Sequence, residues 1–210
     1  MFDSPFVRRV AVSLKRLEIP FEHANWSVGK DFDRIRQYNP LGRVPTLVLD
    51  GGEALIDSAA ILDYLDTRVG PARALLPATG RERRDALRLI AIAVGAAEKG
   101  REQIYEKVFR PVDKRHEPWL ARCREQMNGA LAELERACVK RGTGEWILPG
   151  RLSQADITVA CAYTFLTESQ ALTTESARYP ALTALVARCE ALPEFTSTRT
   201  AYSAPSTADH

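Results

Sequence analysis

The chain has 210 residues, 45% of them hydrophobic, which is enough apolar material for a folded core. Lys and Arg number 29 against 27 Asp and Glu, and the formal net charge of +2 gives no basis for nucleic acid or an anionic membrane as a partner. The first five residues lack the pattern of a secretory signal, and the longest apolar stretch, residues 89–97, is too short to span a bilayer.

The first half of the chain mixes helical and extended patterns. A helix is expected over residues 4–17, opened by Ser4 and Pro5, with Arg8, Arg9, Lys15 and Arg16 off its apolar face. The elements expected next are a strand over residues 21–26, a helix over 32–38, a hairpin of strands over 46–49 and 54–56, and a helix that begins at Asp57.

Residues 69–80 contain glycine and proline without sustained periodicity and are typical of a linker. The pattern after them is helical, over residues 81–110, 118–140, 154–169 and 180–191. The polar end, residues 201–210, is expected to be a disordered tail. The sequence therefore predicts an α/β domain over residues 1–76, an all-helical domain over 81–200 and this tail.

The cysteines lie on helix-like segments of the second half and show no CxxC or Cys/His ligand spacing. They are Cys123, Cys138, Cys161 and Cys189. We interpret them as buried, reduced thiols, which are typical of the cytosol. We therefore expect a cytoplasmic protein without a metal site.

Val44 and Pro45 stand at the entry to the hairpin, directly after Arg43. A proline that starts a strand lacks a ladder donor, and a cis bond before it would turn the backbone of Val44 outward. An extended peptide such as glutathione could then pair with the N–H and C=O of Val44 as an added strand. Alternatively, Pro45 only begins an edge strand.

Asp57 and Ser58 stand where a strand ends and a helix begins. A helix N-terminus has unpaired N–H groups and partial positive charge, so the carboxylate of a γ-glutamyl group fits there, assisted by the Ser58 hydroxyl. Asp57 could hold the ammonium of the same group. The alternative is that both residues only cap the helix.

Ser4 stands at the start of the first expected helix. A hydroxyl donor and a helix N-terminus both favour a thiolate over a thiol, and the thiolate is the nucleophilic form. Ser4 is therefore a candidate for activating a bound thiol. It could also serve only as the N-cap.

A structural motif occurs later, where Ser153 and Asp156 have the spacing of a capping box. Leu152 and Ile157 stand at the two positions of the accompanying hydrophobic staple. We expect these residues to fix the start of a helix and to take no part in chemistry.

Taken together, these motifs resemble the glutathione transferase superfamily. The segments that carry the resemblance are residues 4–10, residues 39–45, Asp57 with Ser58, and the capping box with its staple over residues 150–157. They occur in the family's order and with its spacing from Ser4 to Ile157. Each segment is weak alone, and the ordered set is specific.

The resemblance implies a thioredoxin-like, glutathione-binding first half and an all-helical second half. It implies that Pro45 is the cis-proline, that Val44 pairs with glutathione through its backbone, and that Asp57 and Ser58 hold the γ-glutamyl end. Ser4 matches the catalytic hydroxyl of serine-type classes, and Arg43 matches a basic position near the glycyl carboxylate.

The implied activity is conjugation of glutathione, as co-substrate, to small hydrophobic electrophiles, in detoxification, by a cytoplasmic homodimer. The second substrate would lie near Tyr105 and Phe109. The alternative is a non-catalytic binding or protein-interaction module on the same fold. A thiol-disulfide reductase would have a cysteine where this chain has Ser4.

The sequence departs from the family pattern at its N-terminal start. Family members place a strand inside the sheet before the active-site loop, whereas this chain begins three residues before Ser4. Either the natural protein begins earlier, or this variant has lost that strand. We expect the first strand to be missing or truncated.

Overall fold

The computed structural model describes residues 1–142, 145–169, 171 and 175–204. Its elements in chain order are α1 (Pro5–Arg16), α2 (Phe32–Arg36), β1 (Thr46–Val48), β2 (Ala54–Ile56), α3 (Ser58–Val69), α4 (Gly80–Phe109), a 3-10 turn η1 (Val112–Lys114), α5 (Glu117–Lys140), α6 (Gln154–Glu168), a second 3-10 turn η2 (Glu175–Arg178), α7 (Pro180–Glu190) and α8 (Pro193–Thr196). The predicted helices and hairpin strands are confirmed, and α8 is an addition. The fold is a small antiparallel sheet with helices, followed by a helical part.

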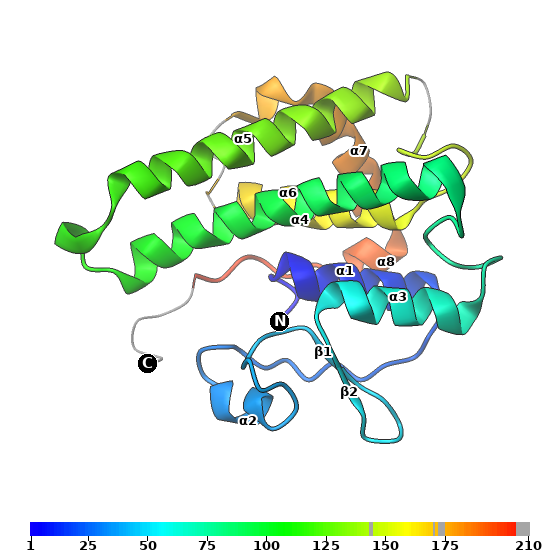
Figure 1. Ribbon diagram of the computed structural model, residues 1–210, viewed down its shortest axis with the longest axis horizontal. Helices are drawn as coiled ribbons and strands as arrows, with labels where there is room; N and C mark the ends of the chain where they lie inside the picture. Colours follow the sequence, from blue (N-terminus) through cyan, green and yellow to red (C-terminus); the bar gives the residue numbers. More distant parts are fainter. Residues whose placement is uncertain (143–144, 170, 172–174, 205–210) are drawn as a thin grey trace.

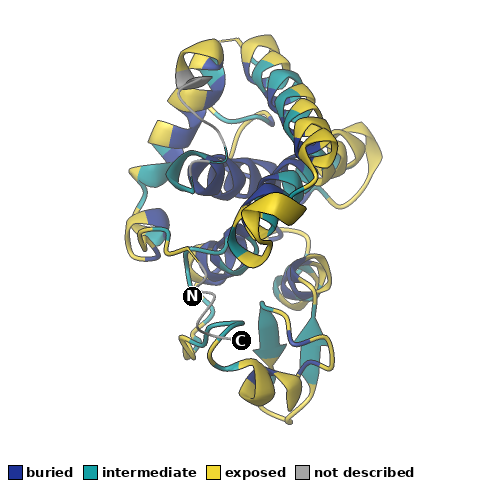
Figure 2. Cartoon of the chain, turned by 90° about the vertical axis from the view of Figure 1, so that its left-hand side faces the viewer, coloured by how far each residue is buried: buried dark blue, intermediate teal, exposed yellow. Residues whose placement is uncertain are grey.

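Helices α1 and α3 lie between the sheet and the long helices α4 and α5 (Figure 1). The apolar stripe of α1 is buried at Val10 and Leu14, and α1 contacts α3, α6 and α8. Helix α6 is buried from Gln154 to Leu166 and packs against α1, α4 and α7. The core is therefore centred on the helical part, while much of the sheet region is coloured as intermediate or exposed in Figure 2.

The sheet has two strands among the described residues, β1 and β2, paired antiparallel with Leu47 opposite Leu55. The prediction of a strand over residues 21–26 is wrong, because this segment has no regular secondary structure. A strand needs a neighbour for its backbone hydrogen bonds, and none of the described segments pairs with this one. An apolar pattern that is typical of a strand was therefore not sufficient to predict one here.

A cavity of about 1200 Å³ lies beside this segment. Residues 19–24 form one wall, and residues 44–51, which include β1, form another. Side chains of α1 and α3, such as Val10 and Ile61, also line it. The cavity thus lies between residues 19–24 and the segment that contains β1, and none of the described strands lies between the two.

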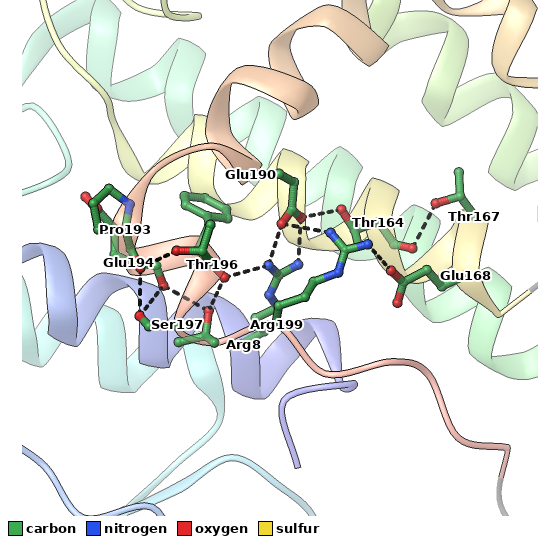
Figure 3. A network of polar contacts seen from close by, with 12 residues as sticks. Arg8, Thr164, Thr167, Glu168, Glu190, Pro193, Glu194, Thr196, Ser197 and Arg199 are labelled. Atoms are coloured by element: carbon green, nitrogen blue, oxygen red, sulfur yellow. Dashed lines mark hydrogen bonds and ion pairs between the residues drawn. The ribbon is translucent and has the colours of Figure 1, made fainter.

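Arg8 and Arg9 are both buried, at 3% exposure, contrary to the prediction that they lie off the buried face. Arg8 donates from both terminal nitrogens to Glu190, at 2.7 and 2.6 Å, and also to the carbonyl of Phe195 at 3.1 Å (Figure 3). Thr164 and Arg199 donate to the same carboxylate. This network joins α1 to the last helices of the chain.

All four cysteines are buried and free, as predicted. Burial raises the pKa of each thiol, to about 12 for Cys138 and Cys161, so these side chains stay protonated and unreactive. Residues 205–210 of the expected tail lie outside the described part. Tyr202, near its start, packs edge-on against Phe165.

None of the helices in the described part of the chain is long and apolar enough to cross a membrane. Within the same part, no group of three or more His, Cys, Asp and Glu side chains is placed to hold a metal ion.

Candidate functional site

Ser4 is the N-cap of α1, and Pro5 occupies the first helical position. The Ser4 hydroxyl oxygen accepts the backbone N–H of Val7 at 3.4 Å, a long contact. No acidic residue stands in the first turn of α1, although Asp3 directly precedes Ser4. The Ser4 hydroxyl is the acceptor in this contact, and no described residue accepts its proton, so the proton can be donated to an anion at this end of the helix.

The loop before β1 is organised by Asn39, to which the sequence analysis gave no role of its own. Its buried side chain donates to the carbonyl of Arg43 at 2.8 Å and accepts the N–H of Leu41 at 3.0 Å. The peptide bond between Val44 and Pro45 is cis. Arg43 itself is exposed, with its guanidinium directed at no described carboxylate.

Asp57 is the N-cap of α3 and is exposed, whereas Ser58, the first residue of the helix, is buried. The Asp57 carboxylate accepts the N–H of Ala59 at 2.8 Å, and its backbone has a positive φ of 67°. A side chain in this left-handed region is uncommon and is a reason to consider function. The Ser58 hydroxyl accepts a hydrogen bond from Arg9 at 2.7 Å.

Ser4 and Asp57 lie at the same end of the pair formed by α1 and α3 (Figure 1). Helices α1 and α3 contact each other, and both begin at the same end of the pair, so Ser4 and Asp57 open neighbouring helices (Figure 1). Val44 and Pro45 line the cavity together with the residues just before Ser4, Met1 and Phe2. Among the described residues, however, no hydrogen bond or ion pair joins Ser4, Arg43 and Asp57 to one another.

Aromatic side chains lie close to this end of α1. Tyr105 and Phe109, the residues expected near a second substrate, are each 37% exposed, with their rings 5.1 Å apart in an edge-on arrangement. The guanidinium of Arg101 lies 5.8 Å from the Tyr105 ring and 5.9 Å from the ring of Phe6. The start of α1 and the end of α4 therefore share an aromatic surface.

Ser153 and Asp156 form a capping box at the start of α6. One carboxylate oxygen accepts the N–H and the hydroxyl of Ser153, at 2.9 and 2.6 Å, and the other accepts the N–H of Ile147 at 2.7 Å. Burial raises the pKa of Asp156, while these hydrogen bonds oppose the rise. The box is structural, and it also holds the loop before α6.

Comparison with known proteins identifies the family of this chain. The model of the glutathione S-transferase N-terminal domain matches residues 1–73, and that of the C-terminal domain matches residues 117–188. A relative in Escherichia coli K12, the uncharacterized GST-like protein YibF, is 33% identical over 165 residues, which is 79% of each chain.

Solved structures agree. A glutathione S-transferase of Methylobacterium radiotolerans, in complex with glutathione sulfonate, has a TM-score of 0.86 at 28% identity and covers 98% of this chain and 92% of its own. A glutathione transferase family member from Pseudomonas fluorescens Pf-5, with bound glutathione, has a TM-score of 0.82 at 32% identity and covers 95% and 96%. The chain belongs to the glutathione S-transferase family.

Proposed function

We propose that this protein is a glutathione transferase that uses Ser4 to stabilise the glutathione thiolate and transfers it to small hydrophobic electrophiles. The observation that carries the proposal is the Ser4 hydroxyl, half-buried at the N-terminal end of α1, whose proton is accepted by none of the described residues. Relatives crystallised with glutathione or glutathione sulfonate support the choice of ligand.

Such a site can supply the free energy that is needed to lower the pKa of the glutathione thiol. A free thiol has a pKa of about 8.5, so at neutral pH only a few per cent is thiolate. Lowering the pKa by about two units needs about 2.7 kcal/mol of preferential stabilisation of the anion. One charge-assisted hydrogen bond from Ser4 and the end of α1 together can supply that amount.

The remaining groups would orient glutathione. Asp57 would pair with the γ-glutamyl ammonium, and Ser58 with the start of α3 would take the carboxylate. Val44 would pair through its backbone with the cysteinyl unit, and Arg43 would approach the glycyl carboxylate. The thiolate sulfur would then attack the electrophilic carbon, forming a C–S bond as the leaving group departs with its electron pair.

The second substrate would lie against the aromatic surface of Tyr105, Phe109 and Phe6. Half-exposed aromatic rings suit a small apolar electrophile, because they offer apolar area that water covers in the free protein. With this activity we propose a role in detoxification and a cytoplasmic homodimer. Sedimentation of the purified protein would test the dimer.

Turnover by Ser4→Ala tests the mechanism. We expect it to fall at least tenfold, about 1.4 kcal/mol in activation free energy, with glutathione affinity little changed. Ser4→Thr keeps both the hydroxyl and the helix cap, and it should retain most of the activity. Equal turnover of Ser4→Ala and wild type at pH 6.5, where thiolate supply limits the rate, would remove Ser4 from the mechanism.

One observation favours an alternative, a non-catalytic binding module. The cavity of about 1200 Å³ beside β1, which has both apolar and polar side chains in its lining, is large enough for a small-molecule ligand. A protein that is retained on immobilised glutathione yet turns over none of a panel of aryl halides, epoxides and unsaturated carbonyls would support this alternative over the transferase.

A further inference from the structure

Arg101 on α4 is a cation that no described carboxylate pairs with. It is partly exposed, and its guanidinium lies over two aromatic rings, 5.9 Å from the centre of Phe6 and 5.8 Å from that of Tyr105. In the described part of the chain, no carboxylate oxygen lies within 4.0 Å of it, and none of its N–H groups donates a hydrogen bond to another residue. Its five donors are therefore left for water or for a ligand.

Two carboxylates close to Arg101 along α4 already have other partners. Glu102 accepts two hydrogen bonds from Lys99, at 3.0 and 3.1 Å. Glu106 accepts a hydrogen bond from Arg110 at 2.7 Å. This stretch of the helix therefore neutralises the cations on either side of Arg101 and leaves the charge of Arg101 itself without a counterion.

Arg101 lies on the surface proposed for the second substrate. Arg101, Tyr105 and Phe109 recur at intervals of four residues, so they share one face of α4. Phe6 belongs to the first turn of α1, which Ser4 caps. The ring of Phe6 beneath the guanidinium is therefore only two residues from the hydroxyl proposed to hold the thiolate.

One guanidinium beside apolar rings fits a ligand with an apolar body and a single negative group. A carboxylate can accept two parallel N–H bonds from an arginine, and the rings of Phe6 and Tyr105 offer apolar area to the body. A phosphate dianion would require a second cation, whereas Lys99 is paired with Glu102. The arrangement therefore favours a carboxylate over a phosphate.

We propose that Arg101 is a specificity-determining residue that selects electrophiles carrying a carboxylate. The apolar body lies against Tyr105 and Phe109, and the carboxylate accepts hydrogen bonds from Arg101, which presents the electrophilic carbon to the sulfur held at Ser4. The C–S bond forms at that carbon and the leaving group departs with the electron pair of its bond, so Arg101 exchanges no proton. The inference rests on the proposed function and names the substrate class of the same site.

The test compares two electrophiles of nearly the same shape, 4-(chloromethyl)benzoate and 4-(chloromethyl)benzamide. Chloride leaves from the same position in both. The readout is the kcat/KM for the carboxylate divided by that for the carboxamide, each corrected for the uncatalysed reaction with glutathione. The intrinsic reactivities of the two compounds are the same for every variant, and a fall in the folded fraction lowers both values together. Changes in the ratio therefore report selectivity.

Arg101→Gln should lower the ratio about tenfold, because the carboxylate loses a charge-assisted partner. Arg101→Lys keeps the charge without the planar fork, and it should retain part of the preference. Arg88→Gln is the matched control, since it makes the same change on the same helix about 20 Å away, at an arginine that pairs with Glu133. Its ratio should equal that of the wild type.

Binding of the products gives a second measurement that needs no variant. S-(4-carboxybenzyl)glutathione should bind the wild type more tightly in calorimetry than the corresponding carboxamide. Raising the NaCl concentration from about 20 to about 200 mM should reduce this advantage, because salt screens partly exposed charges. This measurement decides if Arg101→Gln does not fold.

The outcomes separate the two proposals. A wild type that conjugates neither of these compounds nor any of a panel of uncharged electrophiles overturns the proposed function and this inference with it. A wild type that conjugates the uncharged electrophiles overturns the inference alone if it rejects the carboxylate, or if Arg101→Gln has an unchanged ratio. An unchanged ratio with a lower melting temperature would show that Arg101 only joins α4 to α1. A product advantage that is absent or insensitive to salt also overturns the inference.

Discussion

Replacing Asp156 with Ala tests the energetics of the helical part. The Asp156 side chain is 0% exposed and accepts three hydrogen bonds, two from Ser153 and one from the N–H of Ile147. Hydrogen bonds to a charged group contribute about 1.5 to 3 kcal/mol each, and the variant leaves two backbone donors without an acceptor. The burial cost of the carboxylate, seen in its raised pKa, offsets part of the sum. We expect a loss of about 2 to 4 kcal/mol.

Urea unfolding measures this loss. Ser153→Ala is the control, because it removes one hydroxyl and leaves the carboxylate and its bond to Ile147 in place. It should cost about 1 kcal/mol, the usual contribution of an N-cap side chain. If the two variants unfold at the same urea concentration, the carboxylate adds nothing beyond the hydroxyl, and the reasoning from its three hydrogen bonds is wrong.

Three further changes test other parts of the molecule. Asp57→Ala should weaken glutathione binding by about 1.5 to 3 kcal/mol, since the ligand ammonium loses its partner; equal affinities in calorimetry would contradict this. Burial raises the pKa of Glu190, but hydrogen bonds from Arg8 and Thr164 outweigh that and hold the pKa below its ordinary value. Its stabilisation is therefore present at neutral pH and lost as the pH falls, so the wild type should lose more stability than Glu190→Gln between about pH 5 and pH 3 in chemical unfolding. Adding about five residues of alternating apolar character before Met1 should raise the melting temperature by supplying a strand to the cavity beside β1; equal melting temperatures would show that the fold does without it.

Local signals predicted much of this structure. The Ser4 cap, the hairpin from Thr46 to Ile56 and the capping box at Ser153 depend on residues a few positions apart, and all three are present. Such features depend on short-range backbone geometry, which a single sequence displays directly. The placement of Ser4 and Asp57 at the starts of neighbouring helices follows from the same signals together with the order of the elements.

The contacts between residues far apart in the chain could not be predicted from the sequence. The pattern over residues 21–26 is typical of a strand, but a strand also needs an adjacent chain segment, which the pattern does not reveal. Arg8 and Arg9 were expected away from the buried face because charge usually marks solvent exposure. Arg8 is buried because Glu190, 182 residues later, meets it, and Arg9 because Ser58 and Thr158 do. The buried Asn39 was missed for the same reason.

The cavity beside β1 also bears on how the protein behaves at high concentration. With two strands described, β1 has an edge that faces the cavity, and Val48 on it is 45% exposed. A strand edge with free backbone groups beside apolar surface is a template for pairing with a segment of another chain. No lysine or proline within Thr46–Val48 discourages such pairing. Association through this edge would increase with protein concentration. Its products would have no fixed size, unlike a symmetric dimer. Val48→Lys would suppress this association.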